Sequence, residues 1–138
     1  RGVLVQDAAS GALIAHSDEA QQTAELLLDA MESRKPRPGP KRSTSILRTL
    51  SYLIGEQTPP ATKARLLKIA QTYLFPAKTH AAAPQGALRA LEALGPDARS
   101  AIPAILRYRR TADRFTRQYI DRHVLQSIDP EVAKRVAG

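Results

Sequence analysis

Residues 87–106 read ALRALEALGPDARSAIPAIL. Leucine recurs here at every third position, at Leu88, Leu91 and Leu94, and this spacing places side chains on one face of an α-helix. A glycine followed by a proline ends the helix directly after Leu94, and Pro103 suits the first turn of the next helix. The segment therefore predicts two helices joined by a short turn, the first ending at Leu94 and the second beginning at Pro103.

Similar helix ends occur once before and once after this segment. When Leu53, Leu94 and Ile128 are aligned, the successive spacings are 41 and 34 residues, within the range of helical-hairpin repeats, roughly 34 to 47 residues. A single helix pair cannot bury its apolar stripe alone, whereas stacked pairs share one core. The sequence therefore predicts an all-α fold of stacked antiparallel helix pairs, a short α-α superhelix, over residues 44–138.

Apolar residues also recur at helical spacing on both sides of the quoted segment. The earliest of these helices is acidic, with Asp18 and Glu19 in its first turn, where carboxylates suit the positive end of the helix dipole. Besides the helix that begins at Pro103, we expect helices over residues 17–33, 44–54, 61–74, 84–94, 113–127 and 130–137.

Each helix should turn one apolar face toward the core. In helix 61–74 that face is predicted to include Ala64, Leu67, Ala70 and Leu74. In helix 113–127 it is predicted to hold the aromatic and aliphatic residues Phe115, Tyr119, Ile120, Val124 and Ile128.

Two segments outside the helices have a distinct composition. Residues 1–16 hold two short apolar stretches around a turn-forming segment, which fits either a β-hairpin or an ordered extended arm. Residues 34–43 are basic and proline-rich, so we expect a stiff exposed linker after the acidic helix 17–33. A nuclear-address or phosphate-contacting tract is the alternative interpretation of this linker. The whole chain, 1–138, is expected to form a single domain.

The charge of the chain is divided unevenly along its length. The formal net charge of +8 is made up of −5 over residues 1–33, +13 over residues 34–122 and zero over residues 123–138. A block as basic as the middle one would attract a polyanion or an acidic partner. It would also attract the acidic first helix of the same chain, which is the alternative.

Arginine is densest in the segment that connects the last two predicted helix pairs, where it alternates with aromatic residues. Both residue types contact nucleic acids, arginine through phosphates and aromatic rings through stacked bases. On one helix, Arg110, Arg114 and Arg117 would share a face. Alternatively, Arg117 pairs with Asp113 or Asp121 and the aromatic side chains belong to the core. The candidate contacts for a polyanion or a protein partner are Arg107, Arg109, Arg110, Arg114, Arg117 and Arg122.

The turn within residues 87–106 and its proline-led second helix resemble HEAT-like repeats of the lyase-associated type. The resemblance is clearest over residues 87–131, where Arg117 stands at a place that often holds an arginine in such repeats and Asp113 precedes it. The loop 76–84 is longer than a regular repeat of this kind needs. What the resemblance implies is a right-handed stack of helix pairs used as a protein-interaction scaffold, and occasionally as a nucleic-acid grip.

The sequence lacks motifs for catalysis and metal binding. It has no cysteine, and none of its histidines, His16, His80 and His123, lies three or four residues from another, so no helix presents a paired zinc motif. A glycine-rich phosphate loop is also absent. We therefore predict no catalytic, cofactor or metal site and no enzymatic activity. No apolar run approaches the roughly 20 residues that cross a bilayer, so we predict no membrane partner. The absence of cysteine fits a cytoplasmic location, which is our default expectation.

These observations predict a non-enzymatic module or scaffold that binds another protein or another domain of the same polypeptide. The expected contact surfaces are the exposed faces of the second helices and the loop 76–84. The alternative is a nucleic-acid-binding helical-repeat protein that uses an arginine-rich surface between repeats. A third interpretation is an enzyme whose catalytic groups lie elsewhere in a longer chain, since Arg1 in place of methionine indicates an excised domain or a processed product.

Overall fold

The computed structural model describes residues 18–33 and 39–137. Within these ranges every regular element is a helix, so the all-α prediction is confirmed. The strand-like pairing in this part of the chain is limited to an isolated bridge between Ala77 and His80. The predicted hairpin or arm at residues 1–16 lies outside the described residues.

Proline is the first residue of α3 (Pro40–Leu53), α4 (Pro60–Tyr73), α5 (Pro84–Leu94) and α9 (Pro130–Ala137). A proline suits this position because the first-turn N–H has no partner within the helix and the ring presets a helical φ. The remaining elements are α2 (Asp18–Glu32), the 3₁₀-helix η2 (Gly95–Ala101), α6 (Ile102–Arg109), α7 (Arg114–Tyr119), the π-helix η3 (Ile120–Val124) and α8 (Leu125–Ile128).

The start of α3 corrects the predicted linker 34–43. Gly39 precedes the helix with an extended backbone, at φ −69° and ψ 174°, and Pro40 is its first helical residue. A proline interrupts a helix only from its interior, and in the first turn it favours helix formation. Residues 40–43 are therefore helical, while residues 34–38 lie outside the part of the chain that the structure describes.

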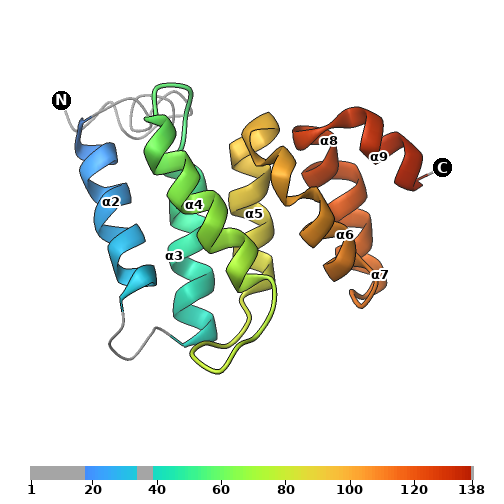
Figure 1. Cartoon of the computed structure of the whole chain (residues 1–138), viewed down its shortest axis with the longest axis horizontal. Helices are drawn as coiled ribbons and strands as arrows, with labels where there is room; N and C mark the ends of the chain where they lie inside the picture. The colour runs from blue at the N-terminus through green and yellow to red at the C-terminus, as the bar shows by residue number, and fades with distance from the viewer. Residues whose placement is uncertain (1–17, 34–38, 138) are drawn as a thin grey trace.

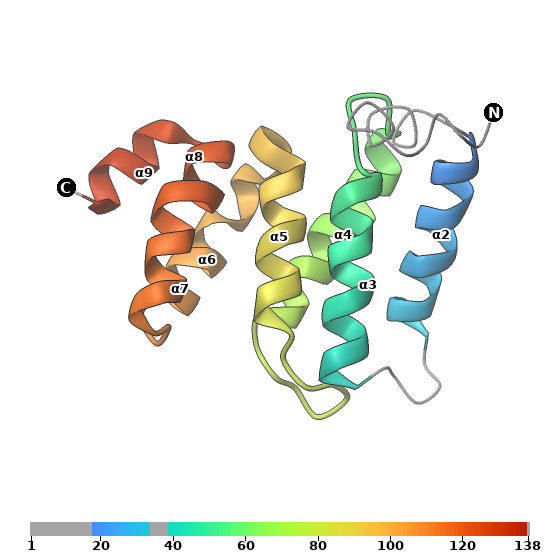
Figure 2. The same ribbon diagram turned by 180° about the vertical axis from the view of Figure 1, so that it is seen from behind.

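The helices are arranged in two layers. In one layer, α3, α5 and the continuous run α7–η3–α8 lie side by side, and α4 and α6 cover the other side (Figures 1 and 2). At one end of this stack, α2 packs on α3 and α4. The layer of α3, α5 and α7 presents one helix from each of three successive predicted pairs, so it repeats along the stack.

A single hydrophobic core runs through the stack from α2 to α9. Its members belong to both layers, so each helix contributes the apolar stripe that it could not bury alone. The largest fully buried aliphatic side chains of this core are Leu28, Met31, Leu47, Leu50, Leu66, Leu74, Leu88, Leu91, Ile105, Ile120 and Leu125.

In α4, the buried face differs from the predicted one. Ala70 and Leu74 are buried as predicted, but Ala64 is exposed and Leu67 is only half-buried. Leu66 and Tyr73 are buried instead. Two stripes at helical spacing compete on this helix, and the stripe with Leu66 and Tyr73 carries the larger side chains, so it removes more apolar area from water. Tyr73 also reaches α2, where its hydroxyl donates a hydrogen bond to the Met31 carbonyl oxygen at 3.4 Å.

The contact between α3 and α5 is the most extensive of any helix pair in the described ranges. At its centre is Gly86, where an added Cβ would lie 2.9 Å from the Leu47 Cβ and 2.9 Å from both the Cα and the carbonyl oxygen of Thr44. Carbon atoms of a side chain do not approach backbone atoms this closely. Only glycine at this position allows the two helix backbones to pack at the observed distance.

The turn from α6 to α7 is fixed at both ends. Arg109, the last residue of α6, donates from Nε and Nη2 to the two carboxylate oxygens of Asp121 in η3, each at 2.7 Å. At the start of α7, the Asp113 carboxylate accepts a hydrogen bond from the Thr116 backbone N–H at 2.7 Å. The side chains of Arg109 and Asp121 are 28% and 14% exposed, so this two-point ion pair is stronger than one on the open surface.

Replacing Gly86 with serine should push α3 and α5 apart. We expect Gly86→Ser to lower the free energy of unfolding by about 1–3 kcal/mol, the usual cost of an overpacked contact. Urea denaturation followed by circular dichroism measures this loss. The matched control is Gly39→Ser, because no atom lies within 4 Å of a Cβ at Gly39 and serine is a favoured residue before a helix. Equal losses in the two variants would contradict the close approach.

Replacing Arg109 with alanine should leave the Asp121 carboxylate half-buried without its two donors. We expect Arg109→Ala to lower the free energy of unfolding by about 1.5–3 kcal/mol, the range for hydrogen bonds to charged groups. Arg109→Lys keeps the charge but not the two-point geometry, so its loss should be intermediate. The control is Arg110→Ala, an exposed neighbour that should change stability by less than about 0.5 kcal/mol. Thermal and urea unfolding of the three variants test this ranking.

Candidate functional site

The predicted stripe of Arg110, Arg114 and Arg117 is not formed. α6 ends at Arg109, and α7 begins only after the capping residue Asp113. Arg110 therefore follows one helix, while Arg114 and Arg117 belong to the next. A shared face would need an unbroken helix through the turn.

The other candidate arginines have different surroundings. The guanidinium carbon of Arg107 lies 4.5 Å from the centroid of the Phe75 ring, a cation–π contact with the segment that follows α4. Arg109 is held by Asp121. Arg122 is exposed in η3 and makes no hydrogen bond or salt bridge with the described part of the chain. The six arginines predicted as contacts therefore do not form one common surface.

Arg117 does not form the predicted ion pair with Asp113 or Asp121. Its positive charge is one of the smaller causes that lower the pKa of the Asp113 carboxyl, after the hydrogen bonds from Thr116. Asp121 is instead bound by Arg109. Sequence spacing did not reveal this pair because its two members come from different helices.

Phe115 is 81% exposed, which corrects its predicted place in the core. The core side of this helical run passes through Thr116, Ile120 and Val124 at four-residue steps. Phe115 and Tyr119 stand one position earlier, so they fall beside the core face. Tyr119 is half-buried, and Phe115, in the first turn, remains in solvent.

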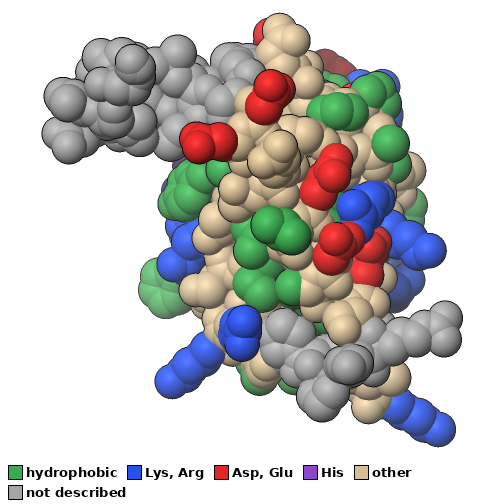
Figure 3. Space-filling model, turned by 90° about the vertical axis from the view of Figure 1, so that its left-hand side faces the viewer, with side chains coloured by type: hydrophobic (Ala, Val, Ile, Leu, Met, Phe, Trp, Pro, Cys, Tyr) green, Lys and Arg blue, Asp and Glu red, His purple; other side chains and the backbone are tan. Residues whose placement is uncertain are grey.

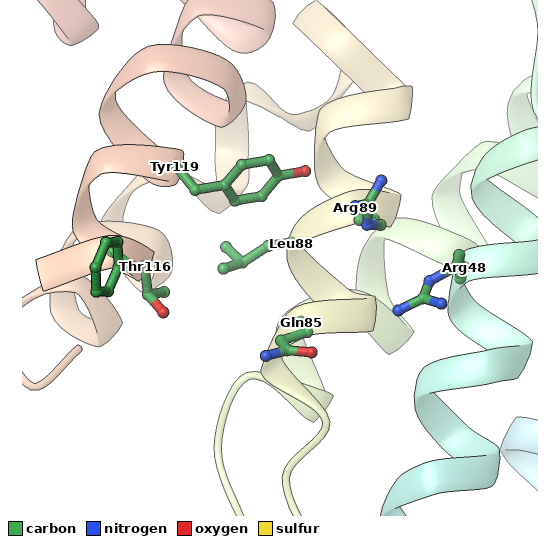
Figure 4. A pocket seen from close by; sticks show the side chains of 7 residues that line it. Arg48, Gln85, Leu88, Arg89, Thr116 and Tyr119 are labelled. Carbon is green, nitrogen blue, oxygen red and sulfur yellow. The ribbon is translucent and has the colours of Figure 1, made fainter. Parts of the chain in front are cut away.

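A groove of about 290 Å³ lies between α5 and α7 and extends to α3, and we call it the α5–α7 groove (Figure 4). Arg48 and Arg89 stand on its α3 and α5 side, Tyr119 extends toward Arg89 from α7, and Leu88 lies between them. The groove therefore combines two guanidinium groups with an apolar and aromatic surface. Its lining residues are Arg48, Gln85, Leu88, Arg89, Phe115, Thr116 and Tyr119.

Tyr119 holds one wall of this groove in place. Its hydroxyl donates a hydrogen bond to Oε1 of Glu92, and its ring centroid lies 6.0 Å from the guanidinium carbon of Arg89 and 5.4 Å from the His123 ring. Burial, followed by the hydrogen bond to Glu92, raises the pKa of Tyr119 above its ordinary value. The phenol is therefore a neutral donor whose position is fixed by neighbours on α5 and η3.

A second groove, of about 450 Å³, lies between α3 and the start of α5, and we call it the α3–α5 groove. Arg48 and Gln85 line both grooves, so the two adjoin. We call the two grooves together the basic face. Lys41, Arg48 and Arg89 are its lining cations, and no aspartate or glutamate of the described ranges lines it.

The repeat spacing explains why Arg48, Arg89 and His123 lie along this layer. They are separated by the same 41 and 34 residues that separate the aligned helix ends. Each therefore occupies the equivalent position of its own predicted repeat, and equivalent positions of stacked repeats line up. Comparing the polar positions of the three repeats would have found this row from the sequence, whereas our prediction considered only the densest run of arginine.

The acidic residues gather elsewhere on the molecule. Figure 3 shows acidic side chains on the end of the stack that α2 forms. Within the described ranges, the basic residue that pairs with α2 is Arg65 of α4, which lies 2.7 Å from Asp29 and 2.5 Å from Glu32. The acidic helix thus pairs with a cation of α4, and none of its described residues lines the basic face.

His80 has a structural role in the predicted contact loop 76–84. Its Nε2 lies 3.0 Å from the Phe75 carbonyl oxygen and 3.2 Å from that of Thr72, and its ring centroid is 4.4 Å from that of Tyr73. The imidazole therefore ties the loop to the end of α4. In the described part of the chain, no group of three His, Cys, Asp or Glu side chains is placed to hold a metal ion.

None of the helices that the structure describes has the length and apolar character required to cross a bilayer.

The Asp113 cap should make stability depend on pH. Hydrogen bonds from Thr116 lower the pKa of the Asp113 carboxyl below its ordinary value of 3.8 in the folded chain. The ionised carboxylate therefore stabilises the fold above pH 3.8, and this contribution is lost as the pH falls through the lower folded-state pKa. We expect Asp113→Ala to be less stable than the parent at neutral pH and the difference to shrink in acid. Urea unfolding at stepped pH measures it, and a difference independent of pH would contradict the assignment.

Comparison of the chain with known protein families, with curated proteins and with solved structures found no match. The structural finding is therefore an all-α stack of packed helices. The HEAT-like resemblance of residues 87–131 stays a prediction.

Proposed function

We propose that this chain is a non-enzymatic binding module whose basic face holds an acidic segment of another protein. The observation that supports the proposal most directly is the lining of the two adjoining grooves, which offers Lys41, Arg48 and Arg89 and no carboxylate. A surface of one charge without internal partners attracts the opposite charge and gives it a defined place to bind.

The arginines of the basic face are free to bind carboxylates. Arg48 makes no salt bridge within the described residues, and the contact of Arg89 is with the face of the Tyr119 ring. An incoming carboxylate therefore displaces no internal acid. Arginine binds carboxylates through two parallel hydrogen bonds, so the contact also orients the partner.

The lining of the grooves gives the proposal its non-enzymatic character. Proton transfer in catalysis most often uses a histidine or a carboxylate within hydrogen-bond reach of the substrate, and less often a lysine, tyrosine or cysteine. The groove-lining residues of the described ranges include no histidine, carboxylate or cysteine, and the hydroxyl of Tyr119 is already bound to Glu92. We therefore favour recognition over catalysis for these grooves.

A protein partner is preferred to a nucleic acid because only three cations of the described residues, Lys41, Arg48 and Arg89, line the basic face. Backbone binding to DNA or RNA depends on several phosphate contacts made together. Of the arginines predicted for this role, Arg109 is occupied by Asp121 and Arg107 by the Phe75 ring. The observation that favours single-stranded nucleic acid is the exposed ring of Phe115, a platform on which a base could stack.

Charge reversal in the grooves tests the proposal. We expect the chain to bind a fluorescein-labelled oligoglutamate peptide. The double variant Arg48→Glu, Arg89→Glu should bind it at least about tenfold more weakly, because both carboxylate contacts become repulsive. Fluorescence anisotropy at constant salt measures the affinity. The matched control is Arg110→Glu, Arg135→Glu, which changes the net charge equally outside the grooves.

The outcomes of this test separate the proposed partners. Circular dichroism verifies that both double variants are folded. An equal loss in the two double variants would indicate non-specific charge attraction and contradict a defined site. Tighter binding of labelled oligothymidine than of oligoglutamate, also lost in the groove variant, would favour the nucleic-acid alternative.

A further inference from the structure

This inference rests on the proposed function and specifies the kind of segment that the basic face holds. We infer that the partner segment is an extended, polyproline-like stretch with acidic residues at every third position and an apolar residue between two of them. The juxtaposition that carries it is the row of Arg48, Arg89 and His123 beside the apolar surface of the α5–α7 groove.

The three members of this row come from successive helices of one layer (Figure 2). Arg48 and Arg89 line the same groove, and Arg89 and His123 both contact the ring of Tyr119, at 6.0 Å and 5.4 Å. The row is therefore continuous from α3 to η3. Each step of the row is one helix wide.

The width of that step follows from helix packing. Axes of packed helices lie about 8–10 Å apart. Small residues bring helices toward the lower end of this range, and Gly86 has that effect between α3 and α5. Groups at equivalent positions of the row are thus expected about 9 Å apart.

An extended polyproline II segment matches this step. It has three residues per turn and rises about 3.1 Å per residue, so every third side chain points the same way at intervals of about 9.3 Å. In a β-strand, side chains on one face recur every second residue at about 6.6 Å, which is too short. Acidic residues at every third position of a polyproline-like segment would therefore meet Arg48, Arg89 and His123 in turn.

The α5–α7 groove supplies a place for an apolar side chain between the second and third acidic residues. Its apolar and aromatic lining is formed by Leu88, Phe115 and Tyr119, and the Tyr119 ring lies between Arg89 and His123. Phe115 is 81% exposed, so an aromatic side chain of the partner would cover apolar area that is otherwise in water. The charged row would set the register of the segment, and the apolar contact would add affinity.

Peptides of equal composition test the spacing. The first peptide is a labelled heptapeptide with glutamates at its first, fourth and seventh positions, proline at the second and sixth, and phenylalanine at the third and fifth. Its order reads the same from either end, so the direction of binding does not need to be known. In the second peptide the three glutamates are adjacent. We expect the first to bind about tenfold more tightly, and phenylalanine-to-alanine changes to remove most of this preference.

Two variants of the chain examine the row directly. Arg89→Glu should abolish the preference for the spaced peptide, while Arg135→Glu on α9 should keep it. His123→Lys should tighten binding of the spaced peptide by about threefold to tenfold. The same variant should have no effect on a peptide whose two terminal glutamates are replaced by glutamine, because the carboxylate that would meet residue 123 is then absent. A gain in affinity also serves as a folding control, since a misfolded variant would bind more weakly.

The results distinguish this inference from the proposed function. Equal affinity for the spaced and adjacent peptides, with both lost in the Arg48→Glu, Arg89→Glu variant, would overturn the spacing and leave the acid-binding face in place. Absence of binding to these peptides and to oligoglutamate would overturn both. Oligothymidine that displaces the spaced peptide at lower concentration than the unlabelled peptide itself would also overturn this inference in favour of a nucleic acid.

Discussion

The close approach of α3 and α5 at Gly86 is the constraint on which the rest of the structure depends. With an added Cβ 2.9 Å from the Leu47 Cβ and from the Thr44 backbone, no other residue fits without moving a helix. The stripes that contain Leu47 and Leu88 pack across this contact, and the exposed residues beside them are brought into one row. Arg48 and Arg89 each follow one of these leucines directly in the sequence, so the packing that buries the leucines also places both arginines along the α5–α7 groove.

The charges of the chain are distributed according to their partners in the fold. Arg109 forms an ion pair with Asp121, and Arg65 forms ion pairs with Asp29 and Glu32. These ion pairs join one helix to another. Such pairs orient helices more than they recognise ligands. The arginines of the basic face are few, and they form no ion pair with an aspartate or glutamate of the described residues. The density of arginine along the sequence is thus a poor guide to the surface, because a run of basic residues includes both structural and free members.

The helices could be predicted from the sequence because their causes are local. Prolines at the first position, the glycine after Leu94 and leucines at helical spacing act within a few residues, and α5 was predicted at its observed bounds. The buried face of α4 and the exposure of Phe115 could not be predicted in this way, because each depends on which stripe a neighbouring helix covers. The grooves lie between helices, so they could not be predicted without knowing how the helices pack. The row of Arg48, Arg89 and His123 is intermediate, since the repeat spacing contains it.

The π-helix η3 allows the last helical run to face three neighbours at once. Its wider turn changes the angular step between residues over Ile120–Val124, so the buried positions Ile120, Val124, Leu125 and Ile128 remain on the core side. Asp121 meets Arg109 at the end of α6, while His123 lies against the Tyr119 ring beside the α5–α7 groove. The helices of a regular repeat need to pack only on the core and on the adjacent repeat. Here the same few residues close the turn and extend the basic face, so the departure from regular helix geometry occurs where the structural pair and the candidate binding surface adjoin.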